Sequence, residues 1–236
     1  PLPPLSYQEM VAEKIVSQNR IIEGAKQVVE SYRPIIDIKP EWEMVLIEDI
    51  SQDTQIGLVK NSSEQGELSE AFKFPYIKMD AINYDGSLNL EKIVYVAATE
   101  EELDKFTLNE GDFIYNTRNT PELVGKSTVY HGLNKKYLFN NNIFRIKFTE
   151  RANPDFINIY LNSAVGKKLI RSLVSGTTSV AALYQKEFMK IAVPLPSIEI
   201  QNELIEVVNK EKSLINANKQ LIAIYEQKIK GEINKL

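Results

Sequence analysis

The sequence predicts an α+β protein in which one mixed domain is flanked by two long helices that pack as an antiparallel coiled coil. Three observations predict this fold. The two ends of the 236-residue chain are copies of each other, each copy has coiled-coil spacing, and short strand-like segments with turn residues lie between them. We therefore expect a first repeated helix at 1–33, a mixed domain at 40–193 and a second repeated helix at 194–236.

The repeat aligns without gaps at an offset of 193 residues. Residues 1–32 and 194–225 share nine identical positions, which include the Pro-Leu-Pro start and the pairs Gln8/Gln201 and Tyr32/Tyr225. Unrelated amphipathic helices often match apolar with apolar residues, but they do not share a Pro-Leu-Pro start with Gln at a fixed distance. The two ends therefore represent one motif used twice.

Each copy is predicted to be a helix that begins after its last proline, because proline disfavours helix at the residue before it. Ser6 and Ser197 are the expected N-caps. The helices are expected to run antiparallel, because the domain between them must return the chain to the same end of the pair. The alternative is that each helix packs into the core of the domain.

Positions spaced alternately by four and three form the predicted seam of the coiled coil. Its polar members weaken the packing but can fix register and partner. The seam consists of Val11, Ile15, Gln18, Ile22, Ala25, Val29 and Tyr32 in the first copy, and of Leu204, Val208, Glu211, Ile215, Asn218, Ile222, Tyr225, Ile229, Glu232 and Leu236 in the second.

The middle of the chain is typical of a mixed domain. Polar residues and two glycines predict a long loop at 51–71, and Asp85-Gly86 predicts a turn. A short acidic helix or turn is expected at 100–105, a helix at 154–171, and a glycine–hydroxyl loop at 175–179. Strands are predicted at 41–46, 74–79, 92–96, 113–118, 124–129, 142–148 and 191–194.

The composition excludes several kinds of chemistry. The chain has no cysteine and one histidine, His131, so disulfides, thiolate nucleophiles and cysteine- or multi-histidine metal sites cannot form. Residues 124–127 end like a phosphate-binding P-loop, but Thr120 stands where its first glycine belongs. Residues 153–156 depart at Asp155 from the Asn-Pro-Pro-Tyr/Phe tetrapeptide of amino-methylating DNA methyltransferases. We expect no catalytic residue, cofactor or metal, and a surface position for His131.

No apolar run approaches the roughly 20 residues that cross a bilayer. The first four residues, Pro-Leu-Pro-Pro, lack the charged-then-apolar pattern of a secretion signal. We therefore expect no membrane contact and a cytoplasmic location. The start inside the repeated motif, without Met, suggests a piece of a longer polypeptide.

The net charge of −4 hides an uneven distribution. Residues 40–112 carry five basic and seventeen acidic side chains, whereas residues 113–190 carry twelve basic and four acidic ones. Such asymmetry is typical of a surface that binds a polyanion. The alternative is that the two halves neutralise each other within one fold.

The basic half has the composition of a DNA-contacting surface, because lysine and arginine bind phosphates and arginine and asparagine can read base edges. We expect Arg118 to read a base and Lys126 and Lys186 to hold phosphates. An internal ion pair with Asp112 or Glu122 is the alternative for Arg118. The candidate DNA-binding residues are Asn116, Thr117, Arg118, Lys126, Ser127, Thr177, Thr178, Ser179, Tyr184 and Lys186.

These features resemble a known family. The duplicated helix that opens on Pro-Leu-Pro with Gln seven residues on is similar to that of the specificity (S) subunit of type I restriction–modification enzymes. Residues 111–114, Gly-Asp-Phe-Ile, with Arg118 soon after, resemble the family's Gly-Asp-hydrophobic-hydrophobic strand. Residues 175–178 followed by 188–196 resemble its domain exit. The resemblance covers nearly the whole chain, and the repeat is its most specific part.

The resemblance implies half of such a subunit, with one target-recognition domain and its two helices. It implies that the domain reads half of a split double-stranded DNA site. It also implies that the helices space the domains and dock adenine methyltransferase (M) subunits, with restriction (R) subunits as further partners. Methylation, cofactor binding and cleavage would belong to those other subunits.

Two isolated halves are expected to form a homodimer through their helices. One alternative is the recognition region of a fused methyltransferase–specificity polypeptide. Another is a coiled-coil adaptor that binds no DNA. An enzyme that uses the acidic half is disfavoured, because no catalytic constellation is found.

Overall fold

The computed structural model describes residues 3–32, 34–132, 136–176 and 181–234. They form two compact units. The helical unit consists of α1 (Leu5–Ser31) and of the part of α6 (Ile198–Ile233) that starts at Glu206. The mixed unit spans Pro34–Ile205 and so includes the first turns of α6. The predicted α+β class is confirmed, because the structure combines helices with mixed sheets.

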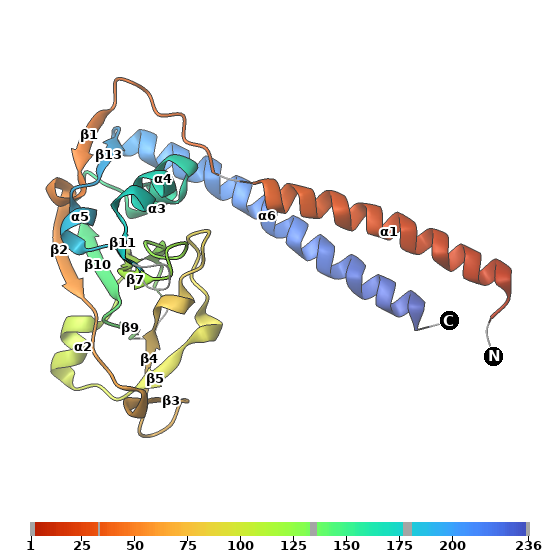
Figure 1. The fold of residues 1–236 in the computed structure, drawn as a ribbon, viewed down its shortest axis with the longest axis horizontal. Coiled ribbons are helices and arrows are strands. Elements are labelled where there is room, and N and C mark those ends of the chain that lie inside the picture. Colours follow the sequence, from red (N-terminus) through yellow and green to blue (C-terminus); the bar gives the residue numbers. More distant parts are fainter. Residues whose placement is uncertain (1–2, 33, 133–135, 177–180, 235–236) are drawn as a thin grey trace. The chain divides into compact units, whose positions relative to one another are not determined.

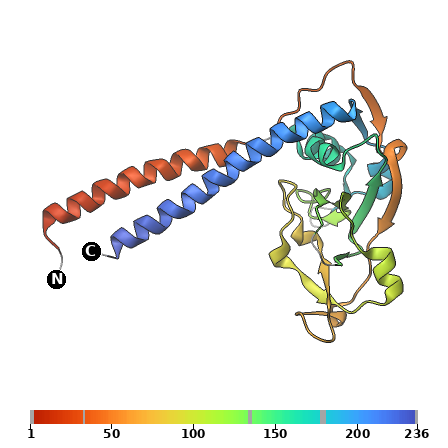
Figure 2. The same ribbon diagram turned by 180° about the vertical axis from the view of Figure 1, so that it is seen from behind.

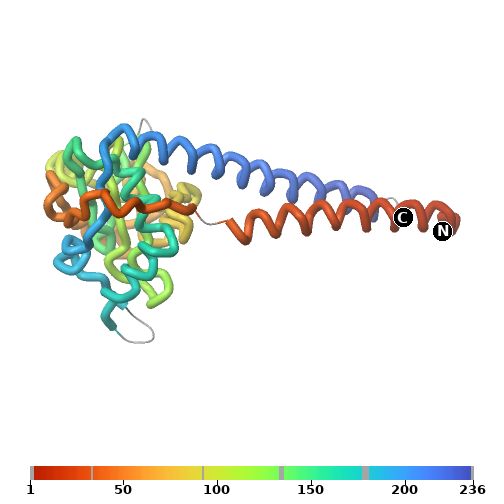
Figure 3. Tube along the Cα trace, turned by 90° about the horizontal axis from the view of Figure 1, so that it is seen from above, coloured from red at the N-terminus to blue at the C-terminus, as the bar shows by residue number. Residues whose placement is uncertain are grey.

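In the helical unit, α1 and α6 lie side by side (Figures 1 and 3). The hydroxyl of Tyr32, just after α1, donates to Glu211 Oε2 at 3.0 Å. Lys26 comes earlier in α1 than Tyr32, and Glu226 comes later in α6 than Glu211. Lys26 Nζ lies 3.9 Å from Glu226 Oε1. Moving back along α1 therefore moves forward along α6, and the predicted antiparallel arrangement is confirmed.

The predicted seam is the buried side of this helix pair. Val11, Ile22, Ala25 and Val208 are buried, and the other seam positions that the structure describes are partly buried. Polar seam residues can fix the register, as the hydrogen bond from Tyr32 to Glu211 shows. Burial and this bond to a carboxylate raise the pKa of Tyr32 to about 12. The two repeats thus pack as the coiled coil that their spacing predicts.

The two helices begin at equivalent positions of the repeat, Leu5 and Ile198. Ser197 precedes the second helix, as an N-cap does, and its carbonyl accepts the Gln201 N–H at 3.0 Å. The prediction that Ser6 caps the first helix is wrong, because α1 already includes it and Pro4 is the cap residue. Proline, with its fixed φ, tolerates this position without a side-chain bond.

The central sheet of the mixed unit is antiparallel. Its order is β2 (Ser51–Ile56), β10 (Ile143–Phe148), β6 (Asp112–Asn116) and β8 (Ser127–Tyr130). Figure 2 shows the orange strand β2 beside the green strand β10. Helix α3 (Pro154–Asn162) packs on β6 and β8 and is followed by α4 (Ala164–Leu173). Phe113, Tyr115, Phe156 and Phe188 fill the core between these layers.

A second four-stranded sheet has its own core. Its order is β3 (Gln65–Gly66), β5 (Val94–Val96), β4 (Phe74–Ile77) and β9 (Leu138–Phe139), with β4 and β9 parallel. Helix α2 (Glu100–Phe106) packs against β9 and begins with a capping box in which Thr99 and Glu102 bond each other's backbone. Ile77, Phe139 and Leu138 are completely buried there.

Two small sheets complete the unit. Strands β1 (Glu43–Leu46) and β13 (Ala192–Leu195) pair antiparallel, so the first and last strands of the mixed unit lie together. A three-stranded sheet has the order β11 (Ser175–Gly176), β12 (Ala181–Ala182) and β7 (Arg118–Asn119). Helix α5 (Gln185–Met189) follows β12. The three-stranded sheet carries Arg118, the main candidate for base reading.

Two predicted elements differ from the structure. The polar stretch expected as a loop at 51–71 contains the strand β2, which pairs with β10 at the edge of the central sheet. The polar side chains of β2 do not show the apolar alternation that predicts a strand, because a strand at a sheet edge can leave most of its side chains in solvent. The helix expected at 154–171 is split at Ser163, whose Oγ accepts the Gly166 N–H at 3.2 Å and so caps α4.

Candidate nucleic-acid interface

Arg118 lies on β7, and its side chain is exposed. Within the described residues it makes no ion pair, so the expected alternative, a pair with Asp112 or Glu122, is not found there. Arg145, and not Arg118, is the arginine that lies beside Asp112. Its Nη1 lies 4.0 Å from Asp112 Oδ2, and its Nη2 lies 2.5 Å from Asp53 Oδ2. Arg118 is therefore exposed at the surface of the domain.

Asn116 and Ser127 lie inside the domain. Asn116 is completely buried, and its Nδ2 donates to the Met79 carbonyl at 2.9 Å. Ser127 Oγ donates to Asn158 Oδ1 at 2.9 Å and accepts from Asn162 Nδ2 at 3.1 Å. Neither side chain reaches the surface in this structure.

The remaining candidates of the small sheet and α5 differ in exposure. Thr117 is partly buried between β6 and β7, and its Oγ1 donates to the Asn142 carbonyl at 3.0 Å. Tyr184 and Lys186, at the start of α5, are exposed. Three further candidates lie outside the described residues: Thr177, Thr178 and Ser179.

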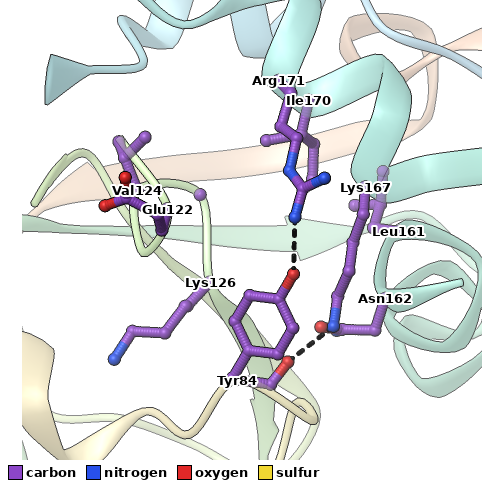
Figure 4. A pocket seen from close by; sticks show the side chains of 10 residues that line it. Tyr84, Glu122, Val124, Lys126, Leu161, Asn162, Lys167, Ile170 and Arg171 are labelled. Carbon is purple, nitrogen blue, oxygen red and sulfur yellow. Dashed lines mark hydrogen bonds between the residues drawn. The ribbon is translucent and has the colours of Figure 1, made fainter. Parts of the chain in front are cut away.

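Lys126 borders a small hollow between α4, the turn before β8 and the turn that holds Tyr84 (Figure 4). The space inside is about 20 Å³, enough for one water molecule and too small for a ligand. Gly125 has φ +78°, and a Cβ there would lie 2.5 Å from Ile170, so glycine lets this turn approach α4. The hollow is lined by Tyr84, Glu122, Val124, Gly125, Lys126, Leu161, Asn162, Lys167, Ile170 and Arg171.

Two cations of α4 hold Tyr84 (Figure 4). Lys167 Nζ donates to the Tyr84 main-chain carbonyl at 2.8 Å and lies 3.6 Å from the ring centroid. Arg171 Nη2 donates to the Tyr84 hydroxyl at 2.9 Å. The two cations are four residues apart, so they lie on the same face of the helix. Tyr84 was not predicted from the sequence, because this residue lies in the acidic half of the chain. The adjacent Asp-Gly turn was the one sequence feature that could have pointed to Tyr84.

The basic residues occupy neighbouring elements. The hollow shares Glu122 and Arg171 with a second depression, which is also lined by β11 and β12. Strand β12 pairs with β7, which carries Arg118. Together, Arg118, Lys126, Lys167 and Arg171 form what we call the basic strip. Cations gathered on neighbouring elements of a domain can bind the phosphates of a polyanion.

His131 is a surface residue, as expected, and it bridges two carboxylates. Its Nδ1 lies 2.8 Å from Glu110 Oε1, and its Nε2 lies 3.0 Å from Asp155 Oδ1. Partial burial works to lower the pKa of His131, but the bonds to both carboxylates outweigh it and raise the pKa above its ordinary value. Within the described part of the chain, no group of histidine and carboxylate side chains could hold a metal ion.

A mixed domain that carries a basic strip and is joined to a repeated helix pair has features typical of a nucleic-acid recognition module. Residues 39–226 match the family described as the type I restriction modification DNA specificity domain, and the chain belongs to this family. The resemblance inferred from the repeat is thereby confirmed. The family points to a DNA specificity domain rather than to an enzyme.

The chain is also similar to a curated relative and to two solved structures. The EcoKI specificity subunit of Escherichia coli K12 is 21% identical over 236 residues, which cover 89% of this chain and 50% of that protein. The chain spans about half the length of the curated relatives it matches.

The HsdS subunit of Thermoanaerobacter tengcongensis has 17% identity and a TM-score of 0.57, covering 100% of this chain and 59% of that one. The S subunit from M. genitalium has 14% identity and a TM-score of 0.56, covering 98% and 60%. These likenesses show the fold.

Among the helices that the structure describes, none is long and apolar enough to cross a membrane.

Proposed function

We propose that this chain recognises one half of a split site in double-stranded DNA as part of a type I restriction–modification system. The observation that carries the proposal is the basic strip, with Arg118 exposed on β7 and Lys167 and Arg171 on α4. The family assignment supports the same conclusion, because it is a family of DNA specificity domains. In this proposal the domain at 40–193 is the target-recognition domain.

The side chains divide between phosphate binding and base reading. Lys126 and Lys186 hold phosphates, which contribute affinity for every sequence and lose it as salt rises. Arg118 reads a guanine, since its fork can donate to O6 and N7 together, worth about 1–3 kcal/mol of discrimination. In this proposal the exposed side chain of Tyr184 contacts the backbone of the same duplex. Three hydroxyl residues assist in holding the backbone: Thr177, Thr178 and Ser179.

The helix pair serves as spacer and dock. Its outer side carries apolar residues at equivalent positions of the two repeats: Ile21 and Leu214 are 37% and 66% exposed, and Val28 and Leu221 are 46% and 36% exposed. The seam already packs the helices against each other, so this second apolar stripe calls for a partner. We propose that it binds M subunits, with R subunits joining the complex, and that isolated halves pair through it as a homodimer.

Methylation, its cofactor and cleavage belong to the partner subunits, and the complex acts on DNA in the cytoplasm. A related reading is that the chain is the recognition region of a fused methyltransferase–specificity polypeptide. The adaptor alternative differs from both in one property, because it requires no DNA affinity.

Fluorescence anisotropy with labelled duplexes separates these functions. The proposed function predicts binding whose log affinity falls linearly with log salt concentration between about 50 and 200 mM. It also predicts that one sequence selected from a random pool binds more tightly than the pool. Absence of binding at every salt concentration would contradict the proposed function and favour the adaptor.

Complementation with methyltransferase subunits tests the division of labour. The chain mixed with its cognate M subunit and S-adenosylmethionine is expected to give a stable complex and adenine methylation at one sequence. The chain alone is expected to transfer no methyl groups. Methyl transfer by the purified chain would contradict the proposal.

A further inference from the structure

The turn that carries Tyr84 is fixed to the domain beneath it. Asn83 N donates to the Ser87 carbonyl at 2.9 Å, and Gly86 N donates to the Asn83 carbonyl at 3.2 Å. The Gly86 carbonyl accepts Asn158 Nδ2 at 3.4 Å. Gly86 has φ +81°, and a Cβ there would lie 2.7 Å from Asn162 Nδ2. Only glycine therefore lets the turn sit this close to α3.

The Tyr84 side chain is held as firmly as the turn, although 43% of the residue is exposed. Figure 4 shows Arg171 at the hydroxyl and Lys167 at the main-chain carbonyl of the same residue. An exposed side chain ordinarily keeps its rotamer freedom, and fixing it costs conformational entropy. Arg171 at the hydroxyl and Lys167 over the ring therefore favour one orientation of the Tyr84 ring, while the bond from Lys167 to the carbonyl holds the main chain.

The hydroxyl of Tyr84 retains a hydrogen to donate. A guanidinium has donors and no acceptor, so the bond from Arg171 occupies a lone pair of the hydroxyl and leaves its hydrogen free to point elsewhere. Among the described residues no acceptor takes this hydrogen. The exposed hydroxyl thus offers a donor at a fixed position beside Arg171.

We propose that Tyr84 determines DNA specificity by donating from its hydroxyl to an acceptor on a base edge, with Arg171 and Lys167 as its positioning residues. The inference rests on the proposed function of the chain. A neutral phenol adds little to phosphate binding beside Lys126, which supplies a full positive charge. A single donor on a rigid ring, by contrast, distinguishes an acceptor from a donor on the base it meets.

The variant Y84F tests this directly, because it removes the hydroxyl and keeps the ring. A duplex is first selected by the unchanged chain from a random pool. The affinities of Y84F for this selected duplex and for a random duplex are then measured by anisotropy. We expect Y84F to weaken the selected duplex about tenfold and to leave the random duplex and the salt slope unchanged. Y95F, which alters a partly buried tyrosine of β5, is the matched control and is expected to change neither.

The positioning role has its own readout. In the Y84F background, R171A is expected to add no further loss of discrimination, because the group that it positions is absent. Additive losses would show that Arg171 acts independently and would overturn its positioning role.

Equal weakening of both duplexes by Y84F would make the contact a phosphate contact and overturn the inference. An unchanged ratio of affinities in Y84F and Y84A, with the circular dichroism spectrum intact, would overturn it too. If the unchanged chain selects no duplex, the proposed function itself is wrong and the inference falls with it.

Discussion

Gln8 and Gln201, at equivalent positions of the two repeats, make the same hydrogen bond. Gln8 Nε2 donates to the Pro3 carbonyl at 2.7 Å, and Gln201 Nε2 donates to the Pro196 carbonyl at 2.8 Å. In each copy the amide closes the corner between Pro-Leu-Pro and the helix. The fixed spacing of proline and glutamine in the repeat is therefore explained by a local structure that both helices need at their start.

The two glutamines differ in what else they hold. Gln201 is completely buried, and it also accepts from the Asn153 N–H at 2.8 Å and donates to the Arg151 carbonyl at 2.9 Å. Gln201→Ala is expected to cost about 2–4 kcal/mol of unfolding free energy, because it removes the partner of the buried Pro196 carbonyl and of two further backbone groups. Gln8→Ala, at a partly exposed position, is the matched control with an expected cost of about 1 kcal/mol or less. Urea denaturation measures both, and equal losses would contradict this account.

The His131 bridge predicts a pH dependence. The folded pKa of His131 is raised, so its stabilising contribution is fully present below the unfolded pKa of about 6.5 and is lost as pH rises through the folded pKa. The imidazole signals of this single histidine can be followed by NMR. We expect a midpoint above the ordinary value, and a normal value in the double variant E110Q/D155N. A midpoint at or below about 6.5 in the unchanged chain would refute the bridge.

Phosphate contacts predict a change in salt dependence. Lys126→Ala and Lys186→Ala are each expected to weaken all duplexes alike and to reduce the slope of log affinity against log salt by about 1. Lys39→Ala is the control, since this exposed lysine pairs with Asp37 outside the proposed interface. A loss confined to the selected duplex would instead assign base reading to these lysines.

The outer stripe of the helices predicts association. The unchanged chain is expected to sediment as a dimer at high micromolar concentration, and Leu214→Glu is expected to make it monomeric and to abolish the complex with M subunits. Asn216→Glu adds the same charge at another exposed position of α6 and is expected to change neither. A monomeric unchanged chain would count against the dimer, and an M complex that survives Leu214→Glu would count against the dock.

Much of this fold was predictable, because the repeat and the spacing of Val11, Ile22 and Val208 are local patterns. The strand β2 was not, because its polar side chains follow from its position at a sheet edge, which only tertiary structure reveals. The split of the helix at Ser163 was hidden for a similar reason, since a serine inside an apolar helical pattern becomes a cap only when the chain bends there.

The site was less predictable than the fold. Asn116 and Ser127 have the side chains of DNA-binding residues, but composition cannot show that they are buried. Tyr84 belongs to a segment with net negative charge, yet the turn fixed by Gly86 places it beside two cations that come more than 80 residues later in the chain. Charge summed along a sequence identifies a basic segment, whereas packing decides which residues share its surface.

The ratio of affinities for selected and random duplexes in Arg118→Ala tests the central claim most directly. The account predicts that this ratio falls by about tenfold, while the affinity for random DNA and the circular dichroism spectrum stay unchanged. Arg151→Ala, which removes an exposed arginine paired with Glu43, is the matched control and should leave the ratio intact. An unchanged ratio in folded Arg118→Ala would contradict the claim that this exposed arginine of β7 reads a base.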